Sequence, residues 1–161
     1  MANKNSETEP VIADVAPSVL DQHTHDEVRM LYVESTETMR FAKNHQWYTV
    51  GATLLTYLGM VFVAGFVNAD AALTNKLMGI TILMACAVIV TLGIYQFWMH
   101  NEMTKINAMQ PYLSSLFRDI RALKSSRESD IHRYTLLIFM IMVVIFGATV
   151  VHLALQRIAG T

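Results

Sequence analysis

The sequence predicts an all-α integral membrane protein with three transmembrane helices and cytoplasmic amphipathic helices that form a helical hairpin. Three runs contain no Asp, Glu, Lys or Arg: residues 47–67, 77–99 and 134–155. Each is long enough for a helix that crosses the hydrocarbon core, which takes about 20 residues. Charged residues make up 16% of the chain, against about 25% in soluble domains. Apolar residues occur on all sides of each run, unlike the single stripe of a soluble amphipathic helix or the alternation of barrel strands.

The segment before the first run divides into a tail and a helix. Residues 1–22 are rich in polar residues and predict a disordered N-terminal tail. Residues 23–46 predict a cytoplasmic amphipathic helix, because apolar residues recur every three or four positions. The recurring positions are Val28, Leu31, Tyr32, Ser35, Met39 and Ala42. Since neither Pro nor Gly occurs between Ser18 and Trp47, this helix is expected to continue into the first transmembrane helix as one rod.

The first two runs are joined by a short connection, residues 68–76, which predicts an antiparallel pair of transmembrane helices. After the second run the sequence contains no helix breaker before Pro111, so the second helix is expected to extend beyond the membrane. Pro111 is expected to end or kink that helix, or to open the next one in its first turn.

Residues 100–133 predict a cytoplasmic helical segment, and the stretch PYLSSLFRDIRALKSS is its most amphipathic part. One face carries Leu113, Leu116, Phe117, Ile120 and Leu123, and the other carries Arg118, Arg121 and Lys124. Two placements fit this pattern, and in the first the basic face binds anionic lipid headgroups. Alternatively, the apolar face packs against Val28, Tyr32 and Met39. Glu34 and Glu37 then lie near the arginines, and we favour this placement because it covers apolar surface.

The third run is preceded by SSRESD, which predicts a loop. Asp130 at its end is expected to be the N-cap of the third transmembrane helix. Residues 156–161 are expected to form a short tail outside the membrane.

Lys and Arg near the runs predict the orientation, because these residues accumulate on the cytoplasmic side. Nine lie in residues 23–46 or between the second and third runs, and two, Lys76 and Arg157, lie on the opposite side. We therefore expect the N-terminus in the cytoplasm and the C-terminus outside. The expected location is the bacterial inner (plasma) membrane, since the first residues show neither a secretory signal peptide nor the glycine needed for myristoylation.

Three histidines accompany aromatic residues at the expected cytoplasmic membrane edge, in the stretches NHQWY, WMH and HRY. If the helices form a bundle, His45, His100 and His132 lie at similar depth and could share one metal ion or a haem. No two of them have the spacing of ligands on one helix, and histidine suits membrane interfaces without any metal. We therefore favour interfacial polar roles and expect no cofactor, and a metal site at these positions stays a hypothesis. Cys86 is the single cysteine, which excludes a disulfide within the chain.

Catalytic and transport signatures find little support in the sequence. It contains no Gly-rich phosphate loop, HExxH or CxxC motif, and the three runs lack the ionisable residues that transporters place in the membrane. We therefore expect a non-enzymatic assembly or accessory (scaffold) component of a membrane complex, which associates with itself. Its expected partners are the lipid bilayer, including anionic lipids, further copies of the chain and a larger membrane complex, and nucleic acid is not expected.

Two alternative functions remain open. An oligomeric ion channel or pore would place the polar residues of the runs on a common axis: Thr53, Thr56, Thr81, Thr91 and Gln96. A metal- or haem-binding subunit of a membrane redox complex would use the three histidines. Small residues at which helices could approach closely are Gly51, Ala52, Thr56, Gly59, Ala85, Gly93, Gly147, Ala148 and Thr149.

The layout of an amphipathic helix that leads into a membrane hairpin, followed by cytoplasmic helices, resembles that of small bacterial membrane modules of the SLATT group. That resemblance implies an oligomeric pore-forming effector. It concerns the layout of the chain, and no functional residue is carried over from it.

Overall fold

The structure, a computed structural model, describes residues 16–122 and 126–160, and it describes the side chains of residues 16–121 and 131–160. These residues form helices α1 (Gln22–Phe66), α2 (Ala71–Met109), α3 (Ser115–Ala122) and α4 (Ser126–Ala159), with a 3-10 turn η1 (Gln110–Tyr112) after α2. No β-strand occurs among them, so the all-α prediction is confirmed. The helices α1, α2 and α4 are each long and apolar enough to cross a membrane.

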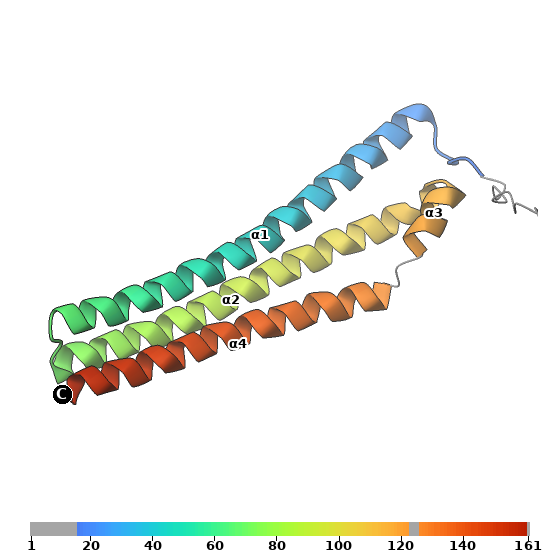
Figure 1. Cartoon of the computed structure of the whole chain (residues 1–161). Helices are drawn as coiled ribbons and strands as arrows, with labels where there is room; N and C mark the ends of the chain where they lie inside the picture. Colours follow the sequence, from blue (N-terminus) through green and yellow to red (C-terminus); the bar gives the residue numbers. More distant parts are fainter. Residues whose placement is uncertain (1–15, 123–125, 161) are drawn as a thin grey trace, which may run out of the picture.

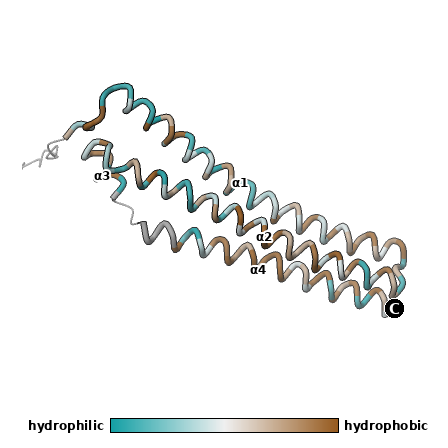
Figure 2. Tube along the Cα trace, turned by 180° about the vertical axis from the view of Figure 1, so that it is seen from behind, coloured by the Kyte–Doolittle hydropathy of each residue, from teal (hydrophilic) through white to brown (hydrophobic). Residues whose placement is uncertain are grey.

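The helices α1, α2 and α4 lie side by side in one elongated bundle, in which α2 runs antiparallel to both neighbours (Figure 1). The connection between α1 and α2 lies at the same end as the C-terminus, which we call the turn end. The start of α1 lies near α3 at the opposite end, which we call the α3 end, and there α1 leans away from α2. Figure 2 shows hydrophobic residues along all three helices and more hydrophilic residues along the first half of α1.

The bundle core has two layers of buried apolar side chains. The layer in the middle of the bundle contains Val50, Ala85, Val88, Leu92, Met140 and Val144. The layer near the turn end contains Tyr57, Ala64, Ala69, Val151 and Leu155. Buried positions recur at intervals of three, four and seven, the spacing that packs long helices nearly parallel to one another. The outer faces of the three helices expose many large apolar side chains, a composition that suits contact with lipid.

The connection between α1 and α2 is held by two helix caps. Asn68, at φ 49°, is in the left-handed region and closes α1 in the pattern of a Schellman motif. The carboxylate of Asp70 accepts a hydrogen bond of 2.8 Å from the N–H of Leu73 and so starts α2. The connection is therefore shorter than the expected residues 68–76, since residues 71–76 are helical.

The first helix begins directly after Asp21, whose carboxylate accepts a hydrogen bond of 3.1 Å from the N–H of Thr24. It continues unbroken through the first charge-free run, as the absence of Pro and Gly predicts. Residues 22–46 extend it by roughly 37 Å beyond that run, at about 1.5 Å per residue. Of the tail predicted for residues 1–22, residues 1–15 lie outside the described part of the chain.

The segment between α2 and α4 departs from the prediction. The helix α2 extends beyond the second charge-free run and ends two residues before Pro111, as expected. The predicted loop at SSRESD is wrong for residues 126–130, because α4 begins at Ser126 and Asp130 lies inside it rather than at its N-cap; Ser125 lies outside the described residues. SSRESD contains neither Gly nor Pro, and a helix propagates readily once it has started. The helix α4 also continues through Ala159, so residues 156–159 of the predicted tail are helical.

Candidate functional site

A cleft of about 910 Å³ opens where α1, α2, α3 and α4 meet, between the middle of the bundle and the α3 end. The helix α1 contributes Tyr32, Thr36, Met39, Arg40, Lys43 and Gln46 to its lining. Met99, Met103, Ile106, Asn107 and Gln110 come from α2 and η1, Ile120 and Arg121 from α3, and His132, Arg133, Leu136 and Met140 from α4. The cleft therefore reaches from the charge-free part of the chain into its polar part.

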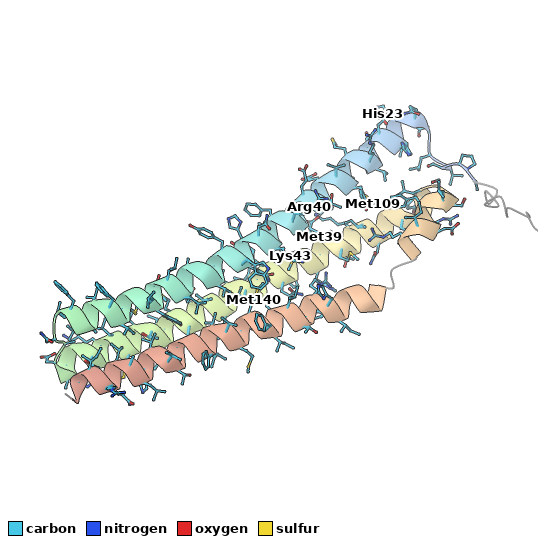
Figure 3. All side chains as sticks on the ribbon, in the orientation of Figure 1. His23, Met39, Arg40, Lys43, Met109 and Met140 are labelled. Atoms are coloured by element: carbon cyan, nitrogen blue, oxygen red, sulfur yellow. The ribbon has the colours of Figure 1, made fainter. Side chains whose placement is uncertain are left out.

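The lining of the cleft combines cationic and apolar side chains. Its basic residues are Arg40, Lys43, Arg121, His132 and Arg133. None of the lining residues that the structure describes carries a carboxylate. Figure 3 labels four of the lining residues, Met39, Arg40 and Lys43 on α1 and Met140 on α4, with Met140 farther toward the turn end. The fold thus gathers basic residues from three helices around one space.

The predicted contact between α3 and the first half of α1 forms through two side chains. The Nη1 atom of Arg121 lies 3.4 Å from the hydroxyl oxygen of Tyr32. The ring of Phe117 packs edge-on against the ring of Tyr32, with 5.6 Å between the ring centroids. Glu34 and Glu37, expected near the arginines of α3, are exposed, and neither forms an ion pair among the described residues. The structure therefore brings Tyr32, Phe117 and Arg121 together beside the cleft.

The other predicted contact residues of α3 are less covered. Leu116 and Ile120 are 51% and 60% exposed, Arg118 is exposed and Leu113 is half-buried. Met39 of α1 is half-buried and lines the cleft, whereas Lys124 lies outside the described residues. The apolar face of α3 is thus covered at Phe117 and open at its neighbours.

Residues that precede α1 also contact the start of α3. The N–H of Ala16 donates to the hydroxyl oxygen of Ser115 at 3.0 Å, and the N–H of Ser115 donates to the carbonyl of Ala16 at 3.2 Å. The hydroxyl of Ser18 donates to the carbonyl of Tyr112 at 2.8 Å. Residues 16–18, expected to be part of the tail, therefore help to hold α3 in place.

The three edge histidines have different surroundings. The ring of His45 stacks on Phe41, with 4.0 Å between centroids, and its centroid lies 6.0 Å from that of Tyr95. His132 lines the cleft, and His100 is exposed. Among the described residues, no group of three or more His, Cys, Asp or Glu side chains could hold a metal ion. The structure therefore does not bring these histidines together.

The polar residues of the charge-free runs divide between the inside and the outside of the bundle. Thr53, Thr81 and Gln96 are buried, Thr91 is half-buried and Thr56 is exposed. The four threonine hydroxyls donate to carbonyls of the preceding turn of their own helix, at 2.7 to 2.9 Å. Because these residues do not line one common surface of the chain, its geometry gives the pore hypothesis no support.

Small residues on α2 form a row that the sequence-based grouping missed. Ala72, Gly79, Cys86 and Gly93 follow one another at seven-residue intervals, and all four are exposed. We call them the α2 stripe. A Cβ atom added at Gly79 or Gly93 would meet no atom of the chain within 4 Å. Ala85, which was grouped with Gly93, is buried in the core, and the heptad spacing is the signal that separates the two faces.

The chain matches no protein-family model, no curated protein and no solved structure. No relative therefore assigns a role to the cleft or to the α2 stripe.

Proposed function

We propose that this chain is a non-enzymatic integral membrane protein that acts as an assembly (scaffold) component and associates with further copies of itself. The α2 stripe is the observation that carries this proposal. In a bilayer, helices associate where small side chains let their backbones approach closely. The stripe belongs to a helix that is apolar enough to cross a membrane, and the fold of the chain leaves it uncovered.

Insertion into a membrane determines which residues of two copies meet in such a contact. Copies inserted in the same orientation hold the same residue at the same depth, so two α2 helices related by a twofold axis meet through identical positions. Cys86 of one copy then faces Cys86 of the other, since it lies seven residues from both Gly79 and Gly93. The seven-residue spacing keeps the contact continuous along nearly parallel helices.

Uncovered apolar side chains at the α3 end support the same proposal. Met30, Val33, Leu116 and Ile120 are between 46% and 64% exposed. They lie beyond the charge-free runs, where a bilayer around those runs does not cover them. Exposed apolar side chains in water favour contact with another protein surface. The accessory role that we propose is recruitment of a larger membrane complex through this end of the molecule.

The proposed orientation places the α3 end in the cytoplasm and the C-terminus outside, in a bacterial inner (plasma) membrane. The excess of Lys and Arg at the α3 end supports it. A membrane-impermeant maleimide tests this orientation. In a Cys86→Ala background, one variant carries Asn75→Cys near the turn end and a second carries Ala108→Cys near the α3 end. Both positions are exposed. In intact spheroplasts the first cysteine should react, and the second should react after the membrane is opened. The reverse pattern contradicts the orientation.

Oxidative cross-linking through Cys86, the only cysteine of the chain, tests self-association. In membranes that contain the full chain, copper phenanthroline should oxidise two Cys86 thiols to one disulfide and give a dimer on a non-reducing gel. The double variant Gly79→Leu/Gly93→Leu should lose most of this dimer, because leucine keeps the two helices apart. The chain itself should still fold, since both positions face open space.

Two controls separate a specific contact from random collision. The double variant Gly51→Leu/Gly59→Leu adds the same side chains to α1, also into open space, and should keep the dimer. Protein with Cys86→Ala and Phe146→Cys carries its cysteine on α4, where Phe146 is 71% exposed, and should cross-link far less. If no dimer forms, or if all these proteins cross-link equally, the proposed association through α2 is wrong.

A further inference from the structure

We propose that the cleft binds the phosphate headgroup of an anionic phospholipid, with an acyl chain of that lipid against its apolar residues. The cleft is a separate feature from the α2 stripe, so this role does not depend on self-association. Its volume of about 910 Å³ is in the range of pockets that enclose small ligands, which is about 300–1,000 Å³.

Cationic side chains from three helices give the cleft its preference for an anion. Arg40 and Lys43 come from α1, Arg121 from α3 and Arg133 from α4. Since no described lining residue carries a carboxylate, the charge of the lining is complementary to that of a negatively charged ligand. A guanidinium group binds phosphate through parallel N–H donors, and an ammonium group adds a point charge. Phosphate is therefore the headgroup chemistry that these residues fit.

The basic residues of the α3 end do not all line the cleft, so the site is not explained by a general excess of basic residues there. Arg29 and Arg118 belong to the same end and are exposed, but they do not line the cleft. Lys105 is also outside the lining, and its ammonium group lies 2.7 Å from the carboxylate of Glu102. Only some of the basic residues therefore line the cleft, and Arg29 and Arg118 serve as matched controls.

The apolar part of the lining fits a lipid better than free phosphate. Met99 is the last residue of the second charge-free run, and Leu136 and Met140 belong to the third. Met39 and Met103 add further thioether side chains, whose flexibility lets them follow the shape of an acyl chain. Free phosphate would leave these side chains uncovered. A phospholipid at the membrane boundary would contact both the cationic and the apolar residues.

Native mass spectrometry of the purified full chain in a neutral detergent measures this binding. The two probes are dioleoyl phosphatidylglycerol, which is anionic, and dioleoyl phosphatidylcholine, which has the same acyl chains and no net charge. Phosphatidylglycerol should bind roughly tenfold more tightly. The double variant Arg40→Gln/Lys43→Gln should weaken that binding roughly tenfold, and Arg29→Gln/Arg118→Gln should change it less than about twofold.

Three outcomes would overturn the proposal. Equal losses in the two double variants would mean that overall charge, and not the cleft, attracts the lipid. Both lipids carry a phosphate, so equal binding of the two would mean that the cleft does not select the net negative charge of an anionic headgroup. If inorganic phosphate at millimolar concentration displaces phosphatidylglycerol, the ligand is a soluble anion and not a lipid. Misfolding is excluded by helical circular dichroism, and by the charge-preserving variant Arg40→Lys/Lys43→Arg, which should bind phosphatidylglycerol almost as the unaltered chain does.

Discussion

The side-chain amide of Gln46 donates a hydrogen bond to the backbone carbonyl of Leu92, with 3.2 Å between Nε2 and O. Both residues are buried, at 4% and 0% exposure. The carbonyl of Leu92 also accepts a backbone hydrogen bond within α2, so the amide uses the second lone pair of that oxygen. Because Gln46 lines the cleft, this bond fixes how α1 faces α2 beside it.

Loss of this bond should destabilise the fold by a modest amount. Gln46→Leu keeps the side-chain size and should lower the free energy of unfolding by about 1 kcal/mol. Helix content can be followed by circular dichroism while SDS is added to the protein in a mild detergent. Gln46→Glu should cost more, because a carboxylate cannot donate to the carbonyl and brings charge to a buried position. If the SDS concentration at the midpoint of unfolding is unchanged in Gln46→Leu, this hydrogen bond does not stabilise the fold.

Gln96 is buried like Gln46 but lacks its hydrogen bond. It is 5% exposed, and neither its amide nitrogen nor its amide oxygen has a hydrogen-bond partner among the described residues. A buried polar group without a partner costs about 1–3 kcal/mol. Gln96→Leu should therefore raise the free energy of unfolding by about 1 kcal/mol or more in the same SDS titration. A loss of stability like that of Gln46→Leu would show that the two amides are bonded alike, against the structure.

The long helices could be predicted because their signals are local. Ionisable residues are costly in apolar surroundings, so charge-free runs mark the apolar helices. Pro111 acts on the backbone within a few residues, and α2 ends two residues before it. Around Asp130 the local signal was polar composition alone, without Gly or Pro. There the expected loop proved to be helix.

The seven-residue spacing of the α2 stripe can be read from the sequence, but its exposure and the cleft could not be predicted, because both depend on which face of each helix turns inward. Runs that are apolar on all sides give no period from which that face can be derived. His45 and His132 were expected at similar depth, yet one stacks on Phe41 and the other lines the cleft. The sequence predicts how far along its helix a residue lies. The direction in which its side chain points depends on how the helices pack.

Gly147 packs α4 closely against α1, and Gly59 provides a control in open space. A Cβ atom at Gly147 would lie 2.8 Å from Cδ2 of Leu54 and 3.1 Å from Cδ2 of Tyr57. The leucine tip can rotate away, but the tyrosine ring is buried and cannot. Gly147→Leu should lower the free energy of unfolding by about 2 kcal/mol. Gly59→Leu should leave it unchanged or raise it by up to about 1 kcal/mol, and equal effects would contradict this packing.

The response of the polar end to acid should depend on Glu102, which lies beyond the second charge-free run. Its carboxylate is 2.7 Å from the ammonium nitrogen of Lys105, and the hydroxyl of Ser35 on α1 lies close enough to favour its charged form. The bond from Lys105 holds the pKa of Glu102 below its usual value of 4.5; burial opposes this shift and Ser35 adds to it. The folded chain therefore keeps this carboxylate charged at pH values at which the unfolded chain protonates it.

Because the folded pKa of Glu102 is the lower one, its stabilisation is complete above about pH 4.5 and is lost as the pH falls through the folded value. Glu102→Gln cannot titrate, so its unfolding free energy should depend less on pH below about 4.5 than that of the unaltered chain. SDS titrations in a series of acidic buffers measure this slope. Glu37→Gln removes an exposed carboxylate of α1 and should retain the full slope. Parallel profiles for Glu102→Gln and the unaltered chain would mean that Lys105 and Ser35 do not hold this carboxylate in its charged form.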